Sequence, residues 1–171
     1  ALQLALATRN VAQAKAMLAR WQALGANSHE LASARAQLAM LQGDRVEAAR
    51  QFDLLLQAGQ AADWKTFAAD LLSARDTAMA GRLLETIATP TRLPEDESVW
   101  VALSQLGEHL GRHALARTLA DAAVKRFDGV ASIGWAASLR LSAGDRAGAE
   151  TLYAKGVRAH PHNADLRLGY A

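Results

Sequence analysis

Residues 141–150 read LSAGDRAGAE, and this stretch carries the signal that decides the fold. Gly144 tolerates the left-handed backbone conformation that closes a helix. Asp145 follows it directly, and its side-chain carboxylate can cap the start of the next helix. Ala149 then lies about one turn into that new helix. We therefore expect one helix to stop and its partner to start within these ten residues.

The same signal returns along the whole chain. Five alanines hold the repeated position, at successive spacings of 34, 32, 36 and 33 residues: Ala14, Ala48, Ala80, Ala116 and Ala149. The position five places earlier holds Arg9, Gly43, Arg75, Gly111 and Gly144. The capping position that follows it holds Asn10, Asp44, Asp76, Arg112 and Asp145. Arg112 is the exception, because its side chain has no acceptor for a helix cap. A unit repeated at about 34 residues is typical of a solenoid of stacked helix hairpins.

The repeated alanines are expected where two helices cross closely. The residue four places after each alanine lies one helical turn further along the same face. These positions hold Leu18, Phe52, Leu84, Ala120 and Tyr153. Helices approach to about 8–10 Å, at the short end of that range when the contact side chains are small. We therefore predict that the alanines are buried contact residues.

The first helix of each hairpin has an apolar stripe of its own. Trp64, Phe67, Ala68 and Leu71 fall at i, i+3, i+4 and i+7, which is the helical period. The equivalent places one repeat later hold Trp100, Leu103, Ser104 and Gly107, and one repeat earlier they include Ala32, Ala36 and Ala39. Strand signals are nearly absent, so the sequence predicts an all-α chain.

These positions resemble the motif of the tetratricopeptide repeat family. The residues that match it are Trp64, Phe67, Ala68, Ala80 and Leu84, and later Gly144, Ala149, Tyr153 and Pro161. The resemblance implies a right-handed superhelical solenoid of antiparallel helix hairpins over residues 1–171. The expected repeats are 1–28 (partial), 29–60, 61–96, 97–129, 130–163 and 164–171, the last being the start of a sixth.

The resemblance also implies a concave groove, lined by the first helices, that holds a peptide or a helix of a protein partner. Carried over by position, the groove residues are Lys65, Thr66, Gln105, Glu108, His109, Trp135 and Ser138. Trp135 has a second interpretation as a core residue, because its large apolar area favours burial. A subtype of the family holds chaperone C-termini with a five-residue clamp. Only Lys65 matches that clamp, so a chaperone tail is not the expected ligand.

Composition excludes several other functions. The chain has no cysteine and a net charge of +2, with no basic stripe, so we expect neither a cysteine-based metal site nor a nucleic-acid partner. His109 and His113 have the spacing of a helical metal pair, but Gly111 lies between them and places them on different helices. No phosphate-binding loop or nucleophile motif is present. We therefore expect no cofactor, no metal and no enzyme activity, and the sequence contains no apolar run long enough for a transmembrane segment.

One junction is irregular. Residues 88–98 contain two prolines and an acidic run, which suits a loop followed by the positive end of a helix. A hinge and a long inter-repeat loop both remain open. The chain also starts and stops within repeats, so we expect it to be a fragment of a longer protein.

The sequence favours a non-catalytic scaffold for protein–protein interaction. Alternatives are the targeting or substrate-presenting arm of a larger enzyme such as a glycosyltransferase, and a structural module that self-associates through uncapped repeat ends. The composition suggests a bacterial source, and cytoplasm and periplasm both remain open. A periplasmic scaffold for polysaccharide export is one version of the first interpretation.

Overall fold

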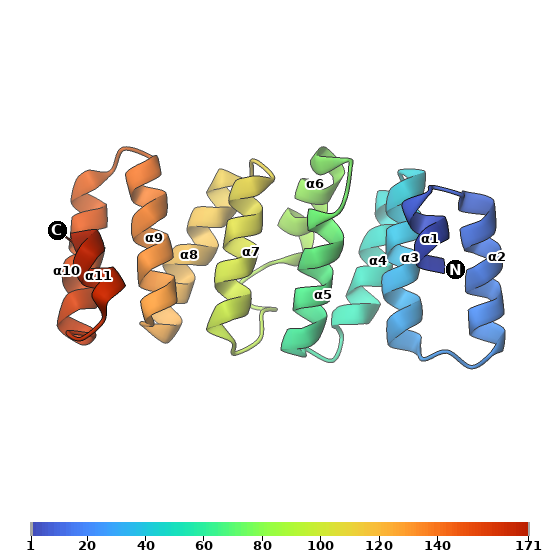
Figure 1. Cartoon of the computed structure of the whole chain (residues 1–171), viewed down its shortest axis with the longest axis horizontal. Helices are drawn as coiled ribbons and strands as arrows, with labels where there is room; N and C mark the ends of the chain where they lie inside the picture. The colour runs from blue at the N-terminus through green and yellow to red at the C-terminus, as the bar shows by residue number, and fades with distance from the viewer. Residues whose placement is uncertain (1, 171) are drawn as a thin grey trace. The chain divides into compact units, whose positions relative to one another are not determined.

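A computed structural model describes residues 2–170, without the side chains of Gln3 and Ala7. Eleven α-helices and no strand form in these residues, which confirms the all-α prediction (Figure 1). Ala1 and Ala171, the ends of the expected array, lie outside the described residues. The helices are α1 (Leu2–Ala7), α2 (Val11–Ala23), α3 (Ser28–Gln42), α4 (Arg45–Leu56), α5 (Ala61–Leu72), α6 (Thr77–Ile87), α7 (Glu97–His109), α8 (His113–Phe127), α9 (Val130–Ser142), α10 (Arg146–Ala159) and α11 (Ala164–Tyr170).

The chain divides into two compact units. The N-terminal unit is Ala1–Ala88 and contains α1–α6, and the C-terminal unit is Thr89–Ala171 and contains α7–α11. The division falls at the beginning of the irregular junction, residues 88–98. Each unit is described by itself below.

Helix ends follow the repeated signal. The side chains at four of the five capping positions each accept a hydrogen bond of 2.8–3.0 Å from the backbone N–H three residues later: Asn10, Asp44, Asp76 and Asp145. Arg112 makes no such bond, as predicted. Gly43, Gly111 and Gly144 have φ between 69° and 81°, the left-handed conformation that closes the preceding helix.

Within the N-terminal unit, helices pack on the helices that follow them. α3 packs against α4 and also contacts α1, α2 and α5, while α6 contacts α4 and α5. Aromatic rings fill the space around α5. Phe67 meets the ring of Phe52 edge-on at a centroid distance of 4.9 Å and that of Trp64 at 5.8 Å. This edge-to-face geometry is favourable for aromatic pairs.

The C-terminal unit repeats this packing. α7 contacts α8 and α9, and α9 contacts α8, α10 and α11. A core cluster joins α8, α9 and α11 through Ala116, Ala120, Val124, Ile133, Ala136, Leu139 and Leu166. In both units, each helix therefore contacts its neighbour in the chain, and most also contact the helix two places away.

The repeated alanines are buried, as predicted. Ala14, Ala48, Ala80 and Ala116 are fully buried and Ala149 nearly so. The first-helix stripes are also core, with Trp64, Phe67, Leu71, Trp100 and Leu103 at most 1% exposed. At the α7–α8 crossing, a methyl group added to Gly107 would lie 3.4 Å from the Ala116 side chain. The crossing therefore leaves room for little more than hydrogen and methyl groups.

Acidic side chains of the junction accept hydrogen bonds at the N-termini of two helices, α7 and α9. Asp96 caps α7 by accepting a hydrogen bond from the Ser98 N–H, so the acidic run does lie at the start of a helix. Glu97 reaches across to α9, where it accepts a hydrogen bond of 2.8 Å from the Ser132 N–H. Glu95 forms an ion pair with Arg126. The last two contacts lie within the C-terminal unit and join positions that are distant in sequence.

Among residues 2–170, none of the helices combines the length and the apolar character that crossing a bilayer would require.

Candidate functional site

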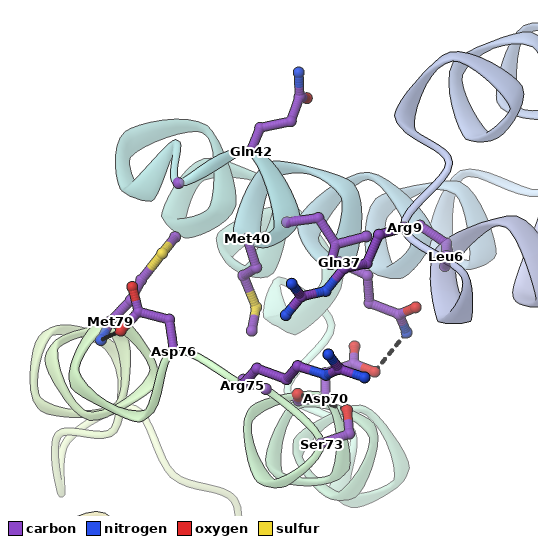
Figure 2. Close-up of a pocket in the computed structure, with 13 residues that line it drawn as sticks. Leu6, Arg9, Gln37, Met40, Gln42, Asp70, Ser73, Arg75, Asp76 and Met79 are labelled. Carbon is purple, nitrogen blue, oxygen red and sulfur yellow. Dashed lines mark hydrogen bonds between the residues drawn. The ribbon is translucent and has the colours of Figure 1, made fainter.

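The N-terminal unit has a pocket of about 560 Å³ (Figure 2). Segments from α1, α3 and α5, the turns that follow them and the first turn of α6 form its walls. The residues that line it are Leu6, Arg9, Gln37, Met40, Leu41, Gln42, Gly43, Asp70, Ser73, Ala74, Arg75, Asp76 and Met79. We call it the Arg9–Arg75 pocket.

Residues from the same position of three successive sequence repeats line the pocket. Arg9, Gly43 and Arg75 each stand five residues before a repeated alanine, and all three line the pocket. The fold of the N-terminal unit brings these turns to one pocket, although Arg9 and Arg75 are far apart in the chain. The position holds glycine at Gly43 and again in the C-terminal unit, so the two arginines replace glycine where their turns meet.

The backbone conformation of Arg9 is unfavourable for a residue with a side chain. Its φ is 56°, in the left-handed region that disfavours side chains with a Cβ. Arg9 and Arg75 are both exposed, and Figure 2 shows both side chains directed over the pocket. Among the described residues, neither guanidinium group has a hydrogen-bond or ion-pair partner. The pocket therefore presents unused N–H donors with positive charge.

The carboxylates of the pocket, by contrast, are already engaged. Asp70 is 7% exposed and accepts hydrogen bonds from Ser33 Oγ at 2.9 Å and from Gln37 Nε2 at 2.6 Å. Burial raises the pKa of Asp70 above its ordinary value, because the charged form loses hydration; the two hydrogen bonds oppose this effect. Asp76 caps α6 through its bond with the Met79 N–H. Of the charged groups that line the pocket, the arginines are therefore the ones with most hydrogen-bonding atoms left for a ligand.

Apolar side chains complete the pocket. Leu6, Met40, Leu41 and Met79 contribute walls beside the polar groups. Methionine adapts to differently shaped apolar groups because its side chain is unbranched and flexible. The combination of apolar walls with a few convergent polar groups is typical of a binding site.

A smaller hollow in the C-terminal unit provides a useful contrast. It measures about 130 Å³ and is lined by Arg140, Asp121 and Asp145, among others. Arg140 donates to Asp121 Oδ1 at 2.9 Å and lies 3.4 Å from Asp145 Oδ2, and the pairing raises the pKa of the arginine. Its guanidinium is already neutralised by internal partners. Within residues 2–170, no described side chain neutralises Arg9 and Arg75 in this way.

The predicted groove residues of the N-terminal unit lie on α5. Lys65 and Thr66 are both exposed there. Thr66 Oγ1 donates to the Ala62 carbonyl within the same helix at 3.1 Å. Asp70 follows Thr66 one turn later on α5, so the predicted surface leads along this helix toward the Arg9–Arg75 pocket.

The other predicted groove residues lie on α7 and α9, which pack together in the C-terminal unit. Gln105 and His109 are exposed, while Glu108, Trp135 and Ser138 are half-buried. Glu108 lies 2.9 Å from His113 Nδ1. As predicted, His109 ends α7 and His113 begins α8, so they do not share a helix.

Trp135 has a structural role in addition to its exposed part. Its indole N–H donates to Ser104 Oγ at 2.8 Å, and Ser104 in turn donates to the Ala116 carbonyl at 2.6 Å. The ring also packs against the core cluster of the unit. These contacts agree with the interpretation of Trp135 as a core residue, and its place in a groove stays a prediction.

Arg9 and Arg75 are recognisable in the sequence by their place in the repeat, but the sequence pattern did not assign them to a site. The available signal was the repeated position itself, where a long cationic side chain twice replaces glycine. No group of three or more potential metal-ligating side chains gathers within residues 2–170. No protein-family model matches the chain, and no curated protein matches it significantly in sequence.

Proposed function

We propose that the chain is a non-catalytic scaffold for protein–protein interaction, a solenoid of helix hairpins of the tetratricopeptide kind that binds a segment of a partner protein. Two features of the chain support this function: contacts between helices one repeat apart, and exposed surfaces on which a partner can bind.

The observation that carries the proposal is a set of hydrogen bonds between first helices one repeat apart. In the N-terminal unit, α3 bonds to α5 through His29 and Asp63 at 2.5 Å, and Gln37 of α3 donates to Asp70 of α5. In the C-terminal unit, α7 bonds to α9 through Glu97 and Ser132. The partners of these bonds are 33–35 residues apart, close to the spacing of the repeated alanines. Stacked repeats require contacts of this kind, because each repeat packs against its neighbours.

The packing pattern supports the same proposal. Contacts of a helix with the next helix and with the one after it are expected when hairpins stack in sequence. Stacks of this kind present extended surfaces for partners instead of one enclosed catalytic cleft. The Arg9–Arg75 pocket and the exposed faces of α5 and α7 are the surfaces available for binding.

A selection from a random dodecapeptide library displayed on phage tests this function with the purified chain. We expect peptides that bind saturably, as an extended segment or as a helix. Lys65→Glu, Glu108→Arg and Trp135→Ala then test the predicted groove, with Arg117→Glu on the exposed face of α8 as the control. Loss of affinity in one of the three variants, with the control unchanged, supports the groove.

The result that contradicts the function is a selection that yields no peptide above the background of an unrelated helical protein. If peptides bind but all three groove variants keep full affinity, the groove is wrong and binding lies elsewhere on the chain.

A further inference from the structure

We infer that the Arg9–Arg75 pocket binds a carboxylate of an acidic peptide segment, with a large apolar residue of that segment seated beside it. This inference rests on the proposed function, which it makes specific by naming the site and the chemistry of the partner. It concerns residues of the N-terminal unit alone.

The charge of the ligand follows from which groups are already paired. The pocket carboxylates of Asp70 and Asp76 accept hydrogen bonds from the protein. The guanidinium groups of Arg9 and Arg75 have no such partner among the described residues. Arginine binds carboxylates through two parallel N–H donors, which gives both strength and orientation. A carboxylate of a partner would form with Arg9 and Arg75 the kind of ion pair that Arg140 forms with Asp121 in the C-terminal unit.

The pocket favours a singly charged group over a phosphate. Asp70 and Asp76 line the same space, so an incoming anion meets their charge as well as that of the arginines. A phosphate group carries about −1.5 to −2 at neutral pH and would be repelled more strongly than a carboxylate. A carboxylate of a protein segment is therefore the better match.

The remaining walls specify the neighbour of that acidic residue. Leu6, Met40 and Leu41 offer apolar surface next to the arginines, and Leu41 is 36% exposed. Burial of a leucine-, methionine- or phenylalanine-sized side chain there removes apolar area from water. The expected partner segment thus has an Asp or Glu, or a terminal carboxylate, adjacent to a large apolar residue.

Peptides from the dodecapeptide selection test the inference. We expect Asp or Glu next to a large apolar residue to be enriched among them. A synthetic binder with an amidated C-terminus should lose about tenfold or more in affinity when its acidic residue becomes Gln or phosphoserine. If instead only the form with a free C-terminus binds, the carboxylate source is the chain end, which also fits the inference.

Variants of the protein test whether the carboxylate of the peptide binds in the Arg9–Arg75 pocket. Arg9→Gln and Arg75→Gln should each weaken binding about tenfold, while the matched controls Arg20→Gln and Arg82→Gln, exposed arginines of the same unit outside the pocket, stay within about twofold. Arg9→Gly guards against a folding artefact, because glycine suits the left-handed backbone at this position. It should lose affinity as Arg9→Gln does while keeping the melting temperature of the natural chain.

The outcomes separate the inference from the function on which it rests. Peptides that bind without an acidic residue, bind better with phosphoserine, or bind equally to the two pocket variants overturn the inference and leave the interaction function standing. A selection without binders contradicts both.

Discussion

At the scale of single residues, small side chains set how closely the helices pack. Ala116 is fully buried and faces Gly107 across the α7–α8 crossing, where a Cβ added to the glycine would come within 3.4 Å. The sequence places such an alanine at every repeat, and its burial could be predicted from the period alone. The contacts that each alanine makes could not, because they depend on which residue the neighbouring helix presents.

Ala116→Leu should lower the free energy of unfolding by about 1–3 kcal/mol, because the larger side chain overpacks the α7–α8 crossing. Urea denaturation followed by circular dichroism measures this change. Ala114→Leu is the matched control, since it makes the same substitution at an exposed position of α8 and should have little effect. Equal stability of the two variants would show that Ala116 is not the contact residue.

Two helical glycines of the C-terminal unit should respond to alanine in opposite directions. Gly134 has open space where a Cβ would lie, so Gly134→Ala should stabilise the chain by about 0.5–1 kcal/mol through helix propensity. At Gly156, the Cβ would lie 2.9 Å from Ile133 and 3.0 Å from Leu166, and both of these side chains are buried. Gly156→Ala should therefore destabilise by about 1 kcal/mol despite the same gain in propensity. Thermal unfolding of both variants tests this, and a shift in the same direction would contradict the packing at Gly156.

Asp70 should make stability depend on pH. Because burial raises its folded pKa above the unfolded value, the folded chain holds this proton more tightly than the unfolded chain. The stabilisation is full below the unfolded pKa, near pH 4, and is lost as pH rises through the folded pKa. Asp70→Asn removes the titration while Asn can still pair with Ser33 and Gln37.

Urea titrations of the natural chain and of Asp70→Asn between about pH 4 and pH 8 measure this effect. The stability of the variant relative to the natural chain should increase with pH over this range. A difference between Asp70→Asn and the natural chain that is constant with pH would rule out the raised pKa.

At the scale of helices, most ends could be predicted because their caps are local. Asp44 and Asp145 bond to an N–H three residues later, so the sequence contains everything that the cap needs. α9 differs, because Gly129 at its N-terminus offers no side-chain cap. Glu97 of α7 supplies the acceptor from the preceding hairpin, at the Ser132 N–H. Sequence reasoning missed this cap because it exists only after the hairpins have packed.

Glu97→Ala should destabilise the C-terminal unit by about 1 kcal/mol, since α9 loses its acceptor and a negative charge at its positive end. Adding Gly129→Ser to that variant should recover much of the loss, because serine can cap α9 locally once the Glu97 carboxylate no longer occupies that space. In the natural chain, Gly129→Ser should instead destabilise or be neutral, since the new side chain displaces Glu97. Additive effects of the two substitutions in unfolding experiments would contradict this capping arrangement.

The Arg9–Arg75 pocket shows a second limit of sequence reasoning at this scale. Its residues come from helices and from the turns that follow α1, α3 and α5, and the repeat period aligns those turns in sequence. Periodicity identifies Arg9 and Arg75 as equivalent positions. It does not reveal that their guanidinium groups have no partner among the described residues, because pairing depends on side chains from other helices.

At the scale of the whole molecule, the chain consists of two units of similar helical packing, Ala1–Ala88 and Thr89–Ala171. Each contains first helices joined by polar contacts one repeat apart, such as His29 with Asp63 in one unit and Ser104 with Trp135 in the other. The two units differ in whether the arginines beside their pockets are paired with carboxylates of the protein. In the N-terminal unit, Arg9 and Arg75 lie over a pocket of about 560 Å³ and have no side-chain partner in the described part of the chain, whereas Arg140 in the C-terminal unit is neutralised by Asp121.

The proposed interaction function, with its proposed site, is most directly tested by NMR on the isotope-labelled full chain, titrated with an acidic peptide from the selection. We predict saturable shifts of backbone amides concentrated at the α1–α2 turn, the C-terminal end of α3 and the α5–α6 turn, which surround the Arg9–Arg75 pocket. The same titration of Arg75→Gln should need about tenfold more peptide. Amide shifts that do not saturate, or that lie entirely outside these three segments, would contradict binding at this pocket.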